Sequence, residues 1–182
     1  AKDHLLVNLF VPATVDWAEQ EAAIIVSTQY PFDDVINVEI SAIKRPRAFA
    51  LSVRVPAWAK NAEFFVNGRK TNLPVTGGYV KISRKWRLSD EFSMKIPMTP
   101  RFETTSDDPN VVAILNGPLV LAADLGAADR PFEGVAPALV GNVEFKSTGK
   151  PQEFTIAAAR PQALALKPFF MLWERRAAVY FP

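Results

Sequence analysis

The chain has 182 residues, of which 49% are hydrophobic and 22% charged, the balance of a globular protein with one large domain or two small ones. Lys and Arg number 21 against 19 Asp and Glu, so the sequence does not predict the basic face of a nucleic-acid-binding protein. It contains no cysteine, which excludes disulfides, cysteine-ligated zinc and thiol nucleophiles from this chain. No stretch approaches the roughly 20 apolar residues that span a bilayer, so no membrane partner is expected.

The first residues lead directly into an apolar segment. Residues 4–11 are nearly continuous in apolar side chains, which predicts a buried strand or, alternatively, a short helix. The residues before them lack the shape of a signal peptide, so we expect the chain to begin within a longer protein or after processing. The compartment stays open, because periplasmic, secreted and cytoplasmic proteins can all lack cysteine.

Further along the chain, apolar and polar residues alternate with the period of two that marks half-buried strands. The runs of this kind are 38–40, 49–55, 80–82 and 92–96. The dipeptide Asn67-Gly68 predicts a hairpin with a type I′ turn, because that turn needs positive φ at both central positions. The spacing of the turn residues predicts about a dozen strands. The two short helix candidates are 16–23 and 157–165.

A polar, turn-forming segment at 104–110 predicts a boundary between two domains. Beyond it, strand-like runs resume and continue to 178–181. We therefore predict an all-β fold of two tandem antiparallel β-sandwiches, of jelly-roll or immunoglobulin-like type. Residues 1–105 are expected to form module 1 and residues 106–182 to form module 2.

Few residues are candidates for chemistry. His4 is the single histidine, and a lone histidine near a terminus is more often structural than catalytic. Asp33-Asp34 and Asp107-Asp108 are adjacent carboxylates, but neighbours on a strand point to opposite faces and both pairs stand in turn-forming contexts. The sequence has no nucleophile elbow and no phosphate-binding loop. We therefore assign no catalytic, cofactor-binding or metal-binding residue in this chain.

The tryptophans offer a second interpretation. They are Trp17, Trp58, Trp86 and Trp173. In a β-sandwich such residues belong more often to the core, yet exposed rings can stack on sugars. The alternative function is therefore a carbohydrate-binding module, which predicts at least two coplanar exposed aromatic rings.

Eight short strings follow one another along nearly the whole chain. They are VNLFVP at 7–12, TQYPF at 28–32, VRVPAWA at 53–59, VNG at 66–68, GYVKI at 78–82, IPM at 96–98, NGPLVLA at 116–122 and PFF at 168–170. In this order and spacing they resemble the C-terminal part of glycoside hydrolase family 127, the β-L-arabinofuranosidase family, formerly a domain of unknown function.

This resemblance implies that the chain is the β-sandwich region of a longer hydrolase. Members of the family carry an (α/α)6-barrel catalytic domain first, with a zinc ion bound by a glutamate and cysteines and with a cysteine nucleophile. Because this chain lacks cysteine, none of those residues carries over, and zinc is implied only for the missing N-terminal barrel. The resemblance implies a non-catalytic region that braces the barrel and can contribute to contacts within a homodimer. The parent protein is then expected to be a β-L-arabinofuranosidase-like hydrolase, and this chain alone no enzyme.

Two stretches depart from the family pattern. The family's tail usually has a His-Asp/Glu pair and an Arg-Tyr before the final strand, where this chain reads WERRA at 173–177. Ser89-Asp90 stands where the family usually has Gly-Asp.

Overall fold

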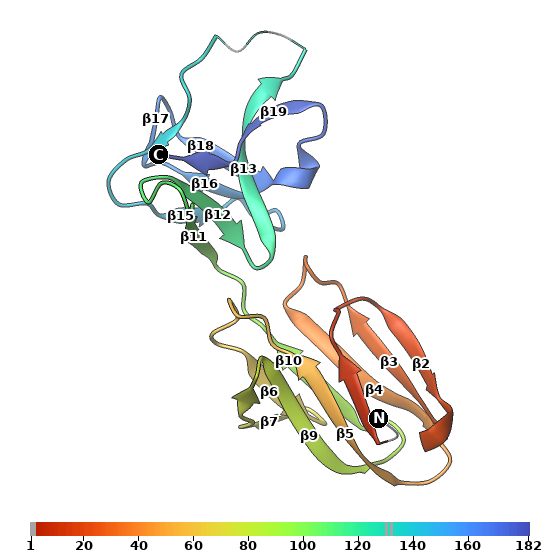
Figure 1. Ribbon diagram of the computed structural model, residues 1–182. Coiled ribbons are helices and arrows are strands. Elements are labelled where there is room, and N and C mark those ends of the chain that lie inside the picture. Colours follow the sequence, from red (N-terminus) through yellow and green to blue (C-terminus); the bar gives the residue numbers. More distant parts are fainter. Residues whose placement is uncertain (1–2, 130, 132) are drawn as a thin grey trace. The chain divides into compact units, whose positions relative to one another are not determined.

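The computed structural model describes residues 3–129, 131 and 133–182. They form two compact units, Ala1–Met98 and Thr99–Pro182, which Figure 1 colours from red to yellow-green and from green to blue. Among the described residues, the helical elements are two 3-10 turns, η1 (Ala18–Gln20) and η2 (Phe169–Met171). The predicted all-β fold class is confirmed. Nowhere in the described ranges is there a helix of the length and hydropathy needed to cross a membrane.

The first unit is a β-sandwich of a four-stranded and a six-stranded sheet. The four-stranded sheet has the order β1-β5-β9-β8 and the six-stranded sheet the order β2-β3-β4-β10-β6-β7. Their bounds in chain order are β1 (His4–Val7), β2 (Ala13–Trp17), β3 (Ala22–Thr28), β4 (Val35–Ile43), β5 (Arg47–Arg54), β6 (Glu63–Val66), β7 (Arg69–Thr71), β8 (Val75–Thr76), β9 (Tyr79–Trp86) and β10 (Glu91–Lys95). One apolar core lies between the two sheets.

The alternating sequence pattern explains this core. Along β5, Phe49, Leu51 and Val53 point inward and are at most 4% exposed. The ring of Phe49 stacks on the fully buried Trp86 of β9 at a centroid distance of 5.7 Å. It also meets Trp17, at the end of β2, edge-on at 5.1 Å. Burying one side chain of this size contributes about 1.5–3 kcal/mol, so these aromatic residues hold the two sheets together.

Strand β1 departs from the antiparallel prediction. It pairs with β5 in parallel, whereas every other strand pair among the described residues is antiparallel. The connection allows the parallel pairing, because β2, β3 and β4 of the other sheet intervene between these two strands and supply the crossover that parallel neighbours need. The expected burial of the whole segment 4–11 was wrong in part: Leu6, Leu9 and Val11 are exposed. Only the side chains that face the core, such as Val7 and Phe10, are buried.

The turns follow their local sequence. Asn67 and Gly68 both have positive φ, 51° and 72°, and connect β6 to β7 as predicted. The helix candidate at 16–23 was wrong, because Asp16 pairs with Ala23 across the β2–β3 hairpin. The candidate at 157–165 was also wrong, since the segment contributes to strands β17 (Ala159–Arg160) and β18 (Leu164–Pro168).

The second unit is built around one curled sheet. Its main path is β11-β12-β13-β18-β16-β15, with β19 paired to β13 and β20 to β12, and β14 and β17 form a separate pair. The bounds not yet given are β11 (Pro100–Thr104), β12 (Val112–Asn116), β13 (Leu119–Ala127), β14 (Ala138–Leu139), β15 (Phe145–Ser147), β16 (Phe154–Ile156), β19 (Arg175–Ala178) and β20 (Tyr180–Phe181). The outermost strands meet through Phe102 of β11 and Phe145 of β15, whose ring centroids lie 5.4 Å apart. The sheet therefore curls around its own core, which includes the fully buried Phe181.

The division between the units lies earlier than the expected boundary at 105/106. Strand β11 pairs with β12 over its whole length, from Pro100 opposite Asn116 to Thr104 opposite Val112. The polar segment 104–110 is therefore a turn inside the second unit, where the Val111 amide donates to the Asp108 carbonyl. Turn residues that close a hairpin and turn residues that join domains have the same composition, so the sequence did not separate the two cases.

Candidate functional site

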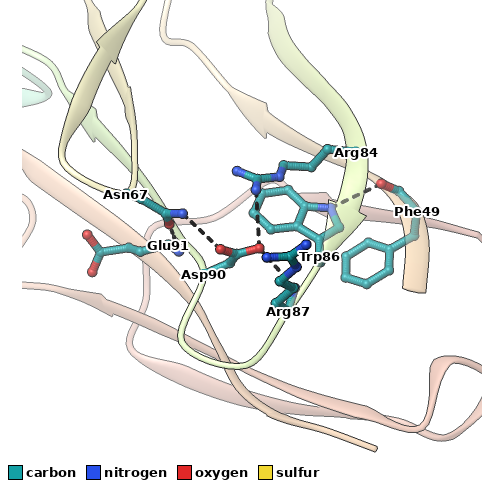
Figure 2. Close-up of polar contacts among 7 residues, drawn as sticks. All are labelled: Phe49, Asn67, Arg84, Trp86, Arg87, Asp90 and Glu91. Atoms are coloured by element: carbon teal, nitrogen blue, oxygen red, sulfur yellow. Dashed lines mark hydrogen bonds and ion pairs between the residues drawn. The ribbon is translucent and has the colours of Figure 1, made fainter. Parts of the chain in front are cut away.

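The densest polar cluster lies at one end of the first sandwich and is drawn in Figure 2. We call it the Asp90 cluster; it comprises Asn67, Arg84, Trp86, Arg87 and Asp90. Asp90 is 7% exposed and stands directly before β10, while Arg84 and Trp86 come from β9 of the other sheet. The cluster therefore joins the two sheets at the point where the chain passes from one to the other.

Both oxygens of the Asp90 carboxylate accept hydrogen bonds. Asn67 donates from Nδ2 to Oδ1 at 2.8 Å, and the Arg87 amide donates to Oδ2 at 2.9 Å. The Arg84 guanidinium lies 3.3 Å from Oδ2 and 5.2 Å from the centroid of the Trp86 ring. Figure 2 shows the Arg84 guanidinium next to the Trp86 ring, with a dashed line that marks its ion pair with the Asp90 carboxylate. The indole N–H of Trp86 donates to the Phe49 carbonyl at 3.1 Å, which fixes the ring.

The environment of Asp90 keeps it ionised. Burial by itself raises the pKa of this carboxyl, but the hydrogen bonds from Asn67 and the Arg87 amide, with the charges of Arg84 and Arg87, lower the pKa below its usual value. An ionised carboxylate whose oxygens are already engaged by internal donors is a poor general acid or base. The arrangement is that of a structural clamp.

The clamp also connects two turns. The backbone amide of Asn67 donates to the backbone carbonyl of Glu91 at 2.9 Å, and the backbone amide of Glu91 donates to Asn67 Oδ1 at 2.8 Å. The hairpin between β6 and β7 is thereby tied to the turn between β9 and β10. Sequence reasoning identified Asn67 as a turn residue and missed the cluster, because its members are up to 23 residues apart and no local pattern connects them. The one signal in the sequence that could have pointed to the cluster was Asp90 itself, which follows Ser89 at the position where the family usually has Gly-Asp.

A second ion pair stands in the second unit. Arg175 of β19 donates from Nε to both carboxylate oxygens of Asp124 on β13, each at 2.8 Å. The Gly126 amide donates to Oδ1 at 3.0 Å. Burial raises the pKa of Asp124, but these hydrogen bonds and the charges of Arg175 and Lys167 lower it below its usual value. The pair borders a hollow of about 510 Å³ whose lining includes Leu125 and Lys167.

The histidine and aspartate candidates lie in separate places. His4 is on β1, where its Nε2 lies 2.9 Å from Ser52 Oγ on the neighbouring strand. The Asp34 amide donates to its neighbour Asp33 Oδ1, and the Ile96 amide donates to the Asp34 carbonyl, both within turn structure. Asp108 accepts from the Asn110 amide at 2.9 Å. The structure therefore does not bring these residues together.

The tryptophans divide between core and surface. Trp86 is fully buried, Trp17 is 9% exposed and Trp58 packs partly buried against the core. Trp173 is 82% exposed, beside η2 of the second unit. The interpretation of tryptophan as core holds for three of the four.

The described residues do not fit the zinc ion implied for the family. They contain no group of three or more His, Asp or Glu side chains that could hold a metal ion, and the sequence has no cysteine. The expectation that this chain binds no metal or cofactor stays a prediction.

Three solved structures that share the fold are described as glycoside hydrolases or arabinofuranosidases. A GH127 β-L-arabinofuranosidase from Geobacillus stearothermophilus T6 matches 100% of the chain with a TM-score of 0.80 and 21% identity. A GH127 β-arabinofuranosidase matches 99% with a TM-score of 0.80 and 23% identity, and a protein described as a glycoside hydrolase matches 93% with 0.70 and 18%. At these identities the likeness shows the fold alone. The match covers 34%, 35% and 34% of those chains, so this chain spans about a third of their length.

The family assignment rests on a match of the sequence to a family model. A search of curated proteins returns no match. Residues 4–98 match the family model described as the middle domain of GH127 β-L-arabinofuranosidases, and they make up more than half of the chain. The chain therefore belongs to glycoside hydrolase family 127.

Proposed function

We propose that this chain is the accessory, non-catalytic β-sandwich region at the C-terminal end of a β-L-arabinofuranosidase-like hydrolase, and that it braces a catalytic (α/α)6 barrel. The observation that carries the proposal is the match of residues 4–98 to a middle domain, in a chain about a third as long as the hydrolases that share its fold. Two-thirds of a protein of that length lies outside this chain and provides room for a barrel.

The contacts of two carboxylates support a structural role for this chain and a catalytic role for the barrel. Its most buried carboxylate, Asp90, is held ionised by internal donors that engage both oxygens. Asp124 is likewise engaged by Arg175 and the Gly126 amide. The two carboxylates belong to different units, and each fixes a turn or strand of its own unit. Zinc and the cysteine nucleophile belong, in this proposal, to the barrel, and dimer contacts are a further role of the same region.

The test is hydrolysis of a chromogenic β-L-arabinofuranoside. The 182-residue chain and the protein encoded by its complete reading frame are assayed side by side at equal molar concentration. We expect turnover by the complete protein and none above the buffer rate by the chain. Turnover by the isolated chain refutes the non-catalytic assignment, and a complete protein inactive on arabinofuranosides and related glycosides refutes the parent activity.

Carbohydrate binding stays the alternative, and Trp173 is the observation that favours it. Among the tryptophans it has the exposure that stacking on a sugar requires. Calorimetric titration of the isolated chain with arabinan distinguishes the two functions. Binding that Trp173→Ala abolishes establishes the alternative, and the absence of heat at millimolar sugar excludes it.

A further inference from the structure

Four large apolar side chains are exposed together in one turn of the second unit. They are Phe169 (52% exposed), Phe170 (56%), Met171 (49%) and Trp173 (82%), and we call them the apolar turn. They fill four of the five positions 169–173, in and just after η2. Single exposed apolar residues are ordinary on protein surfaces, but contiguous ones mark contact sites.

The structure holds this turn at both ends. Pro168 pairs with Leu121 at the end of β18, and Leu172 is 5% exposed, with its amide donating to the Phe169 carbonyl at 3.0 Å. The Arg175 amide donates to the Leu172 carbonyl at 3.2 Å. The Nε of Arg175 donates hydrogen bonds of 2.8 Å to both carboxylate oxygens of Asp124. Because these contacts fix the backbone in advance, a partner that binds the turn pays little ordering entropy.

We propose that the apolar turn is a docking element that inserts into an apolar surface of the polypeptide outside these 182 residues, within the complete hydrolase. This inference rests on the proposed function and assigns it a contact surface. The occupant follows from length, since hydrolases with this fold are about three times as long as this chain. Aromatic side chains at the centre of an interface carry much of its binding energy, and Trp173 has the largest exposed fraction in the turn.

A protein surface fits the turn better than a sugar. Sugar sites combine an aromatic ring with hydrogen-bonding groups that fix the hydroxyls. In this turn three of the four exposed side chains are Phe or Met. The exposed Glu174 follows Trp173, and Arg175, one residue further on, uses its Nε to bind Asp124. The turn therefore offers apolar area with few polar groups, which matches an apolar protein surface.

Hydroxyl-radical footprinting with mass spectrometry tests the assignment. The oxidation rates of Phe169, Met171 and Trp173 are measured in the isolated chain and in the protein encoded by the complete reading frame. We expect the rates to fall about tenfold in the complete protein, because docking removes these side chains from water. Leu88, which is 60% exposed in the first unit, is the reference for general changes in dose.

The outcomes separate the two proposals. If other surfaces of the chain gain protection in the complete protein and the turn does not, the docking assignment is wrong and the accessory role stands. If no surface gains protection, both are wrong. If arabino-oligosaccharides protect Trp173 in the isolated chain, the turn binds sugar and the docking assignment is overturned.

A substitution adds an independent readout. Trp173→Ser is expected to leave the melting temperature of the isolated chain unchanged, because the side chain is 82% exposed there. In the complete protein the same substitution should raise the oxidation rate of Phe169 and Met171 several-fold. Leu88→Ser, the matched control, should not. Equal effects of the two substitutions on the turn contradict a specific docking role for Trp173.

Discussion

Asp90 shows how a buried carboxylate can be structural in a protein of hydrolase ancestry. Its pKa is lowered because Asn67, the Arg87 amide and two guanidinium groups favour the charged form over the desolvation cost. The same contacts occupy the oxygens that a catalytic role would need. Carboxylates with shifted pKa values are functional-site candidates in general, but ion-pair networks shift them too, and here the partners identify a clamp.

Replacing Asp90 tests the clamp. Asp90→Asn removes the charge that faces Arg84 and turns an amide N–H₂ toward a donor. We expect the free energy of unfolding, measured in urea at pH 7, to fall by about 1–3 kcal/mol. Asp16→Asn, at an exposed position on β2, is the control and should stay within about 0.5 kcal/mol. A change at Asp90 no larger than the control contradicts the clamp.

The pH dependence of stability, compared between the native protein and Asp90→Asn, tests the direction of the pKa shift. The pKa of Asp90 is lower in the folded protein than the unfolded value of about 3.9. Its contribution to stability is therefore complete above that unfolded value and is lost as the pH falls through the folded pKa. The difference in unfolding free energy between the native protein and Asp90→Asn should narrow in acid. A difference that stays constant between pH 7 and the acid limit of folding speaks against this assignment.

At the scale of elements, the sequence predicted those features that depend on neighbouring residues alone, namely strand alternation and turn conformation. The alternation at 49–55 placed Phe49, Leu51 and Val53 in the core, since side chains on a strand point alternately to its two faces. Asn67-Gly68 gave its turn type, because positive φ is a property of those two residues. The exposure of Leu6 was not predictable, since it depends on which face of the edge strand β1 meets the other sheet. Leu9 and Val11 lie beyond that strand, in the connection to β2, so the alternation of a strand does not apply to them.

The turn between β9 and β10 contains a residue in an unfavourable backbone conformation, and the free-energy cost of that conformation can be measured. Ser89 has φ 62°, in the left-handed region that suits glycine, at the position where related sequences are expected to carry glycine. Its amide donates to the Ile40 carbonyl, so the turn cannot relax without losing a hydrogen bond. We expect Ser89→Gly to raise the unfolding free energy by up to about 1 kcal/mol in urea denaturation.

Ser83→Gly is the matched control for that substitution. Ser83 is exposed in the middle of β9, where glycine weakens a strand by about 0.5–1 kcal/mol. The two substitutions should therefore change the unfolding free energy in opposite directions. If both destabilise the chain equally, the backbone at Ser89 is not strained.

At the scale of the whole molecule, the chain consists of two β units with separate cores. The fold class and the relation to family 127 could both be read from the sequence, because strand periodicity and the ordered strings extend over nearly its full length. The Asp90 cluster, the Asp124–Arg175 pair and the apolar turn could not, because each depends on tertiary position. The first two features engage polar groups of the chain within its own architecture, and the third exposes four large apolar side chains to solvent.

The proposed bracing role can be tested by one direct measurement. Residues 1–182 are deleted from the complete hydrolase, and the melting temperature of the remaining polypeptide is compared with that of the intact protein. Removing a packing partner exposes apolar surface on the remainder, so we expect a melting temperature lower by at least about 5 °C or a remainder that does not stay folded. A remainder that melts at the temperature of the intact protein contradicts the account.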